Sequence, residues 1–248
     1  MATPMTRDEV LDKLAILATL EHALIVEYLS IRSALGGELP AAEGGATTDQ
    51  GSAAAAAAFS LAFHEMIKFR NVNLALVDAE RPPEVGRAFS IKSESGADIP
   101  LDPPSKEQLQ GLVEREQAIA KAVDKLYVEL APAVTSDPVF EDGLLEQMKR
   151  LIVEDGPTHV AALEPLNSLG NPVPDAILVV TRRATDDPFE QHLLDASDGV
   201  YRVLVATLRD RFEPPAFGSQ TPVTAMDALD AVNKALVGRR LLPPFTAA

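Results

Sequence analysis

Residues 20–29 read Leu20-Glu21-His22-Ala23-Leu24-Ile25-Val26-Glu27-Tyr28-Leu29, and this stretch decides the predicted fold. It lies within a helical pattern, in which apolar residues recur on one face: Val10, Leu14, Leu17, Leu24, Tyr28, Ile31 and Leu35. Glu21 occupies that face where an aliphatic residue is expected. A charged carboxylate is costly in an apolar core unless it is paired, protonated or bound to a metal. Glu21 is therefore the first candidate site residue.

The composition predicts one large globular domain, or one domain with a small one appended. The chain has 248 residues, 46% of them hydrophobic, and 37 acidic against 22 basic side chains give a net charge of −15. This charge disfavours nucleic acid and anionic membranes as partners. The absence of cysteine excludes disulfides, thiolate metal sites and cysteine nucleophiles. We see no signal peptide pattern and no stretch of roughly 18 uncharged apolar residues, so we expect a cytoplasmic protein without a membrane span.

Six helices are predicted from apolar periodicity and from capping and breaking residues. The first begins near Thr6, where Glu9 can complete a capping box, and stops at Gly36-Gly37. The third is expected to end at a break that begins with Pro132. The predicted helices cover approximately residues 6–35, 53–80, 105–131, 144–166, 188–212 and 222–241.

The connections between the first four helices indicate their arrangement. Residues 81–104 contain five prolines and two glycines without sustained periodicity, which favours a long crossover over a tight turn. Two shorter connections and one long crossover are typical of ferritin-like bundles. We therefore predict an all-α fold: a ferritin-like four-helix bundle over residues 1–169, with the long crossover between its second and third helices. Residues 170–248 should form a C-terminal extension with two more helices, packed on the bundle; the β-branched run at 177–181 is left unassigned.

Acidic residues interrupt the apolar face of the other bundle helices as well. Glu65 lies between Leu61 and Phe69 on the second helix, and Glu116 lies between Leu112 and Ile119 on the third. On the fourth helix the interrupting residues are Asp155 and His159, which are four positions apart and so share a face. Glu21 and Glu65 lie at similar depths in their helices, so antiparallel packing should bring them to one level.

Three or four carboxylates and one imidazole in a bundle core favour iron, as a di-iron site, or manganese, because both metals accept hard oxygen ligands and histidine. The predicted ligands are Glu21, Glu65, Glu116, Asp155 and His159, with Glu154, His64 and His22 as secondary candidates. His22 and His64 flank the apolar face, and each is expected more at a helix boundary or in solvent. Tyr28 and Tyr127 are most simply core packing residues, with a radical or hydrogen-bonding role near a metal as the alternative. His192 is most simply a packing or surface residue, with closure of the site as the alternative. As the alternative, each acid could pair with Lys68, Arg115 or an ordered water, and the metal would be absent.

Two phrases resemble a known family. Residues 19–29, Thr-Leu-Glu-His-Ala-Leu-Ile-Val-Glu-Tyr-Leu, and residues 63–74, Phe-His-Glu-Met-Ile-Lys-Phe-Arg-Asn-Val-Asn-Leu, are similar to the first two helices of the ferritin-like domain of the iminophenyl-pyruvate dimer synthase family. The resemblance covers roughly residues 10–170. It implies that Glu21 and Glu65 are metal ligands and that the chemistry concerns amino-acid-derived imines.

The chain departs from that family at two positions. Lys68 stands where a histidine ligand usually follows the second-helix glutamate, and it could replace that ligand as a charge partner of Glu65. Gly156 stands where a glutamate three residues before His159 is expected, so Asp155 or Glu154 would have to substitute.

Two functions follow from these observations. The first is a metal-dependent oxidoreductase, with iron or manganese, that acts on a small and amino-acid-derived substrate. The alternative is a bundle with a degenerate metal site that acts as a scaffold or a small-ligand-binding protein. Neither function requires nucleic acid or a membrane, and a homodimer is compatible with both.

Overall fold

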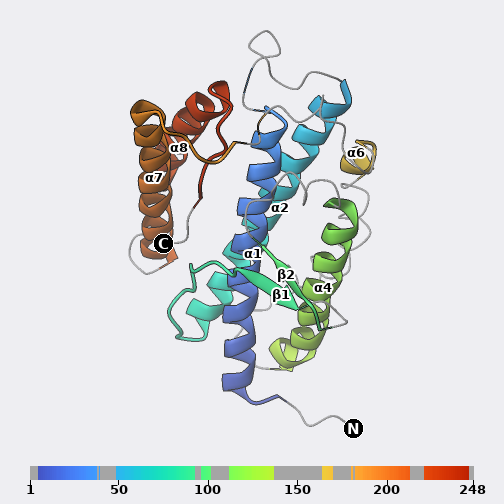
Figure 1. Ribbon diagram of the computed structural model, residues 1–248. Helices are drawn as coiled ribbons and strands as arrows, with labels where there is room; N and C mark the ends of the chain where they lie inside the picture. Colours follow the sequence, from blue (N-terminus) through green and yellow to red (C-terminus); the bar gives the residue numbers. More distant parts are fainter. Residues whose placement is uncertain are drawn as a thin grey trace.

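Helix α1 (Arg7–Ala34) and helix α2 (Asp49–Asp78) form the centre of the molecule in this computed structural model (Figure 1). The structure describes residues 5–37, 39, 49–92, 96–101, 112–136, 164–169, 180, 182–212 and 221–245. Helix α4 (Leu112–Ser136) and the short α6 (Glu164–Asn167) lie on one side of the central pair. Helix α7 (Pro188–Phe212) and α8 (Thr221–Gly238) pack against each other on the other side.

The ends of α1 follow the sequence prediction. Thr6 caps its first turn: the Thr6 hydroxyl accepts a hydrogen bond from the Glu9 amide, and the Glu9 carboxylate accepts one from the Thr6 amide at 2.7 Å. The helix ends at Ala34, and Gly36 adopts a positive φ of 70°, which glycine allows at little cost. The predicted capping box and the predicted stop at Gly36-Gly37 are therefore confirmed.

Burial of α1 is much wider than one face. Eighteen of its 28 residues are buried, including every residue from Leu20 to Tyr28. Its most apolar part has the length and hydropathy of a membrane span, but 78% of that window is buried inside the protein. We conclude that α1 is the core helix of this fold. A single apolar cluster joins it to α2, α4, α7 and α8.

Two parts of the predicted helix pattern are corrected by the structure. The crossover after α2 contains a short antiparallel hairpin of β1 (Ser90–Lys92) and β2 (Asp98–Pro100), with Ile91 opposite Ile99. Helix α4 does not stop at Pro132 but continues through it to Ser136. A proline removes one backbone donor, and the turns on either side of it retain their own hydrogen bonds. Of the predicted fourth helix, only residues 164–166 lie within the described part of the chain, in α6.

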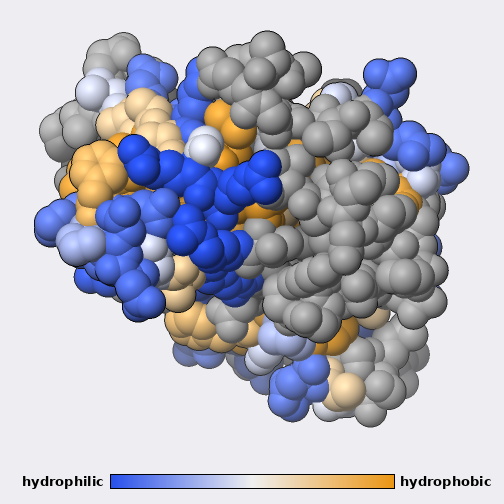
Figure 2. Space-filling model, turned by 45° about the horizontal axis from the view of Figure 1, so that its top comes forward, coloured by the Kyte–Doolittle hydropathy of each residue, from blue (hydrophilic) through white to orange (hydrophobic). Residues whose placement is uncertain are grey.

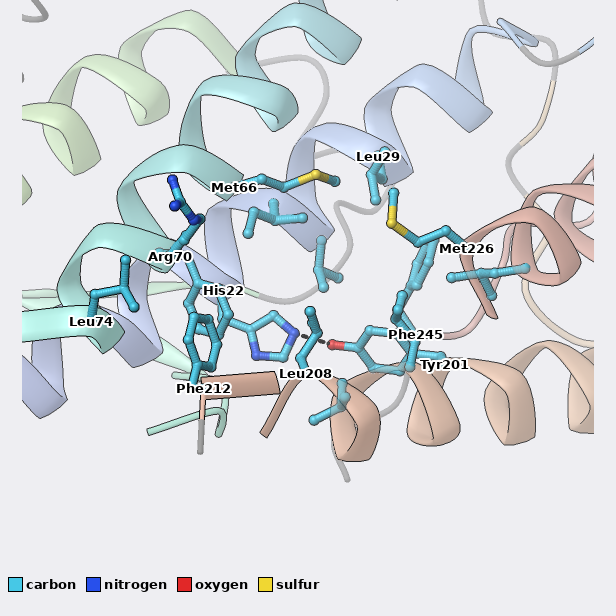
Figure 3. Close-up of a pocket in the computed structure, with 16 residues that line it drawn as sticks. His22, Leu29, Met66, Arg70, Leu74, Tyr201, Leu208, Phe212, Met226 and Phe245 are labelled. Carbon is cyan, nitrogen blue, oxygen red and sulfur yellow. Dashed lines mark hydrogen bonds between the residues drawn. The ribbon is translucent and has the colours of Figure 1, made fainter. Parts of the chain in front are cut away.

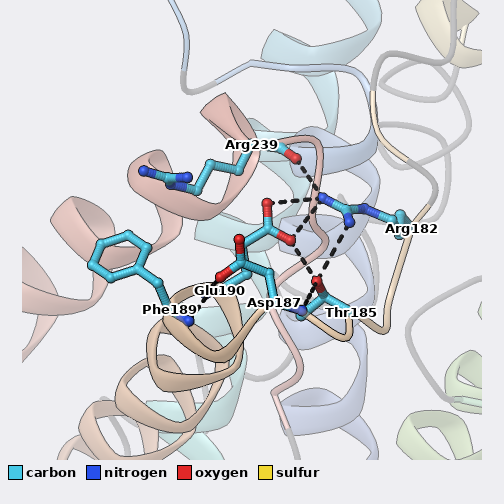
Figure 4. A network of polar contacts seen from close by, with 6 residues as sticks. All are labelled: Arg182, Thr185, Asp187, Phe189, Glu190 and Arg239. Carbon is cyan, nitrogen blue, oxygen red and sulfur yellow. Dashed lines mark hydrogen bonds and ion pairs between the residues drawn. The ribbon is translucent and has the colours of Figure 1, made fainter.

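The C-terminal helices are tied to the centre through backbone and side chains. The Val180 amide donates to the Ala34 carbonyl, and the Leu242 amide donates to the Arg182 carbonyl. Arg182 also binds the Glu190 carboxylate and the Arg239 carbonyl, each at 3.0 Å, while Asp187 caps the start of α7 (Figure 4). Helix α8 contacts α1, and α7 contacts α2. The extension therefore packs on the bundle; the predicted domain boundary at residue 169 stays a prediction.

The outer surface is mixed in character. On the face shown in Figure 2, a continuous hydrophilic area occupies the middle, and hydrophobic side chains lie around it. Several large apolar side chains are more than one-third exposed, among them Phe59, Phe63 and Phe89. The most apolar part of α1 is 78% buried inside the protein, so it is a core element; a cytoplasmic location stays a prediction.

Candidate functional site

Four glutamates are completely buried among α1, α2 and α4. Glu21 and Glu27 come from α1, Glu65 from α2 and Glu116 from α4, and each has 0% exposure. The expectation that Glu21, Glu65 and Glu116 lie in the core is confirmed. Their role as ligands stays a prediction, because Glu154, Asp155 and His159 lie outside the described residues.

Two tyrosines connect α1 and α4 through these carboxylates. The Tyr28 hydroxyl donates to Glu116 Oε2 at 2.7 Å, and the Tyr127 hydroxyl donates to Glu21 Oε1 at 2.9 Å. Each helix thus supplies one donor and one acceptor, as antiparallel packing allows. Burial raises the pKa of Tyr28 well above its usual value, and the charges of Glu116, Glu65 and Glu21 raise it further. The Tyr28 hydroxyl therefore lies within the influence of all three predicted ligands and stays protonated as a donor.

Lys68 is a charge partner of Glu65, as the sequence predicted. Its ammonium lies 3.2 Å from Glu65 Oε1, and the whole residue is only 6% exposed. Glu21 is close enough to this pair to be affected by it. Burial raises the pKa of Glu21 well above its usual value, and the charge of Glu65 adds to that effect, while Lys68 and Tyr127 oppose it.

Arg115 is also a charge partner of the buried acids, as the sequence alternative allowed, but its pairing with Glu27 was not predicted. Arg115 on α4 binds Glu27 on α1, and its guanidinium also lies 3.8 Å from Glu116 Oε1. Burial lowers the pKa of Arg115, and Glu116 opposes that shift. Glu27 is off the apolar face that identified the other acids. The signal available in the sequence was the uninterrupted apolar run just before it, which indicates burial on all sides of the helix.

Carboxylates gather in this interior. The four fully buried glutamates lie beside two cations, with Lys68 against Glu65 and Arg115 against Glu27 and Glu116. The side chains of Glu21 and Glu65 also lie within hydrogen-bonding reach of each other, and two carboxyl groups can form that bond only when one of them carries a proton. Retained protons or a bound cation lower the cost of burying these acids together. Hard carboxylate oxygens in this setting fit the chemistry of iron or manganese.

The described residues alone do not form a complete metal site. Among the residues that the structure describes, no three histidine, aspartate or glutamate side chains are grouped closely enough to hold an ion. Any ion between Glu21, Glu65 and Glu116 would therefore need further ligands, and Glu154, Asp155 and His159 are the predicted ones.

The histidines that were secondary candidates occupy other places. His22 is 6% exposed, so the expectation that it lies at a helix boundary or in solvent is wrong. Its Nδ1 contacts the Val85 and Gly86 carbonyls, and its Nε2 contacts the Tyr201 hydroxyl of α7 (Figure 3). Both nitrogens are engaged away from the carboxylates, which argues against His22 as a ligand. His64 is half-buried and His192 is exposed on α7.

Comparisons with known proteins support the architecture. No family model and no curated protein matches this sequence, so the resemblance to the iminophenyl-pyruvate dimer synthase family gains no support from them. Among solved structures, a ferritin-like protein from Caulobacter vibrioides matches with a TM-score of 0.62 at 14% sequence identity. The match covers 99% of this chain and 100% of the other. At this level of identity the likeness concerns the fold alone, and it shows that this chain has a ferritin-like fold.

Proposed function

We propose that the protein is a metal-dependent oxidoreductase with an iron or manganese carboxylate site in its bundle core. The observation that carries this proposal is the grouping of four fully buried glutamates from three helices in the described interior. A divalent cation would offset the repulsion among their charges. The ferritin-like fold is consistent with such a site because related bundles build theirs from inward-facing carboxylates.

Glu21, Glu65 and Glu116 would hold the ion together with Asp155 and His159, or with Glu154 in place of Asp155. When bound, iron or manganese would supply the capacity to activate dioxygen or peroxide. Other residues of the chain set the charge and the dryness of this proposed site. Lys68 neutralises part of the charge of Glu65, and the surrounding aliphatic side chains exclude water.

The two tyrosines orient carboxylates within this proposed site. Tyr28 donates to one oxygen of Glu116, and Tyr127 donates to one oxygen of Glu21, whose carboxyl group also lies against Glu65. The substrate would be a small molecule, and the sequence resemblance favours an amino-acid-derived one. A homodimer and a cytoplasmic location are compatible with this function.

A second candidate function is a bundle with a degenerate site that serves as a scaffold or binds a small ligand without metal. The contact between Lys68 and Glu65 favours it, since lysine stands where a histidine ligand would be expected and already supplies a positive charge. A proton retained by Glu21, in line with its raised pKa, would supply a second one.

A metal-binding experiment distinguishes the two proposed functions. Chelator-treated protein is titrated with Mn²⁺, and with Fe²⁺ without oxygen, while calorimetry and metal analysis follow uptake. We expect saturable binding that Glu21→Gln and Glu116→Gln each weaken at least about tenfold, which corresponds to about 1.4 kcal/mol. Glu129→Gln is the matched control on α4, because Glu129 pairs with Lys13 at the surface.

The variant Lys68→His tests the departure from the usual ligand pattern. It removes the competing cation and adds an imidazole next to Glu65, so metal should bind more tightly than in the wild type. Failure of wild type and Lys68→His to take up either metal would exclude the oxidoreductase proposal and leave the degenerate bundle.

A further inference from the structure

A cavity of about 300 Å³ lies on the side of α1 and α2 that faces α7 and α8. Its wall is mostly aliphatic and aromatic, and four helices and the segment after α8 contribute to it (Figure 3). Phe69 comes from α2, Phe212 from α7 and Phe245 from the C-terminal segment. A volume of this size is at the lower end of the range for small-molecule sites, which are typically concave and apolar with a few placed polar groups.

Two polar side chains in this wall, His22 and Tyr201, belong to one row of hydrogen bonds that starts at two backbone carbonyls. Backbone carbonyls only accept hydrogen bonds, so the contacts of His22 Nδ1 with Val85 and Gly86, at 2.9 and 3.2 Å, place a proton on Nδ1. His22 is only 6% exposed, and its two nitrogens contact backbone carbonyls and a hydroxyl rather than a carboxylate, so the neutral ring is favoured. In that ring Nε2 is an acceptor, and the Tyr201 hydroxyl donates a hydrogen bond to it at 2.7 Å.

These hydrogen bonds determine whether the Tyr201 oxygen donates to a ligand or accepts from it. Its hydrogen is committed to His22, and burial raises the pKa of Tyr201, so the hydroxyl remains protonated. The oxygen still has acceptor capacity toward the cavity. A ligand at this point would therefore present a donor, namely a hydroxyl or an N–H group.

The charges around the cavity exclude one class of donor. None of the described lining residues is acidic, and Arg70 is the charged side chain among them. Beyond the wall, the positive charge of Arg87 acts on His22 and Tyr201, and the negative charges of Glu84 and Asp198 oppose it. An ammonium group in the cavity would find no carboxylate in the described wall to pair with, whereas a neutral donor needs none.

We infer that this cavity is a binding site for a small, neutral, largely apolar molecule whose single hydroxyl or N–H group donates a hydrogen bond to Tyr201. His22 is a positioning residue in this site, since it orients the Tyr201 hydroxyl. The inference does not rest on the metal proposal. Glu21 and His22 are neighbours in the sequence, but Glu21 binds Tyr127 on α4 and His22 binds Tyr201 on α7. The two sites therefore lie on opposite sides of α1.

Two fluorescent probes of nearly equal shape test the inference. 2-Naphthol carries a hydroxyl donor, and 2-fluoronaphthalene carries fluorine in its place. With the full-length protein we expect both to bind, and 2-naphthol to bind about 3- to 10-fold more tightly, which is the range expected for one neutral hydrogen bond. Equal affinities, or no binding of either probe, would overturn the inference.

Variants assign the binding to this cavity. Tyr201→Phe should abolish the preference for 2-naphthol and leave the affinity of 2-fluoronaphthalene within about twofold. Leu204→Trp fills the cavity from α7 and should weaken both probes at least about tenfold; unchanged affinity in this variant refutes the location even if Tyr201→Phe does not fold. Val203→Ala is the matched control, because Val203 is on the same helix, 53% exposed and outside the cavity wall.

Two further measurements test the stated chemistry and the independence of the site. 2-Naphthylmethylammonium should bind more weakly than 2-naphthol, and tighter binding would contradict the exclusion of cations. Glu21→Gln and chelator treatment should leave the affinity for 2-naphthol unchanged. A loss of probe binding in Glu21→Gln would show that the cavity belongs to the carboxylate site, whereas loss of metal binding alone concerns only the proposed function.

Discussion

Glu21 is a buried acid whose electrostatic cost has both an identified cause and an identified neighbour. Its pKa is raised by burial and by Glu65, so the folded protein retains a proton there that the unfolded chain releases above pH about 4.5. The stabilising contribution of this group is therefore complete below that pH and is lost as the pH rises through the folded-state pKa.

Substitution of Glu21 by glutamine should remove this dependence in metal-free protein. We expect Glu21→Gln to be more stable than wild type at pH 7 to 8 in the presence of chelator, and the difference should shrink toward pH 4.5. Urea unfolding at several pH values measures both trends. A variant less stable than wild type at pH 8 would mean that the ionised carboxylate is compensated in the folded protein.

His22 has the opposite dependence. Burial lowers its pKa, so the unfolded chain takes up a proton near pH 6.5 while the folded protein does not. The stability contributed by neutral His22 is present above pH about 6.5 and decreases as the pH falls toward the folded-state pKa. His22→Gln should flatten the stability profile between pH 7 and 5, as chemical denaturation at constant ionic strength would show. His192→Gln, on the exposed face of α7, is the comparison variant.

The burial and the contacts of some residues can be predicted from the sequence, and those of others cannot. Glu21, Glu65 and Glu116 could be predicted as buried because each interrupts an apolar face, and Lys68 could be predicted as a partner because it lies one turn from Glu65. Tyr201 could not be connected to His22 in this way. Their contact joins residues 179 positions apart and depends on which side of α1 is covered by α7.

At the scale of one element, the contribution of the N-terminal cap of α1 to stability can be measured. The Thr6 hydroxyl and the Glu9 carboxylate satisfy amide donors that would otherwise lack partners in the helix. Thr6→Ala should lower the free energy of unfolding by about 1 kcal/mol. Thr6→Ser keeps the oxygen and should stay within about 0.5 kcal/mol of wild type. If both variants were equally destabilised, the threonine methyl group rather than the cap would be responsible.

The contact between α1 and α4 depends on a buried ion pair. Arg115→Met leaves Glu27 buried without its cation and should cost about 3 to 5 kcal/mol. Addition of Glu27→Leu to that variant should recover most of the loss, because the uncompensated charge is then removed. Lys13→Met provides a comparison on the same two helices, where the exposed pair with Glu129 should contribute less than about 1 kcal/mol. Thermal and urea unfolding of wild type, Arg115→Met, Glu27→Leu and the double variant measure the coupling, and additive losses would contradict it.

Helix ends were predictable where local chemistry sets them and less so elsewhere. The predicted fifth helix matches α7 at both ends, and the first matches α1 within a residue. The hairpin in the crossover was missed because its strands have three residues each, too few for an alternating pattern. The predicted break at Pro132 is wrong, since one missing donor does not end a helix whose apolar face continues to pack.

At the scale of the whole molecule, one layer of two helices separates two chemically different interiors. The carboxylates lie between α1, α2 and α4, and the apolar cavity lies between α1, α2, α7 and α8. The sequence predicted the bundle and the packing of the extension on it. It could not predict the cavity, whose wall combines residues from His22 to Phe245 and is therefore a property of the assembled fold.

The net charge of −15 predicts a response to salt. Surface carboxylates repel one another in the folded protein, and this repulsion is screened as the ionic strength rises. The melting temperature should therefore increase between about 20 and about 300 mM NaCl, and choline chloride should have a similar effect if general screening is the cause. Buried pairs such as Arg115 and Glu27 are screened much less. A melting temperature that fell over this range would show that surface ion pairs outweigh the repulsion.

The burial of α1 on almost all sides also concerns how the protein is made. In the cell α1 leaves the ribosome long before α7 and α8 are translated, so its apolar surface has no complete cover during that time. A nascent chain in this condition is a substrate for chaperones and a risk for aggregation. Expression yield should consequently respond to chaperone supply and growth temperature more strongly than the stability of the finished fold would suggest.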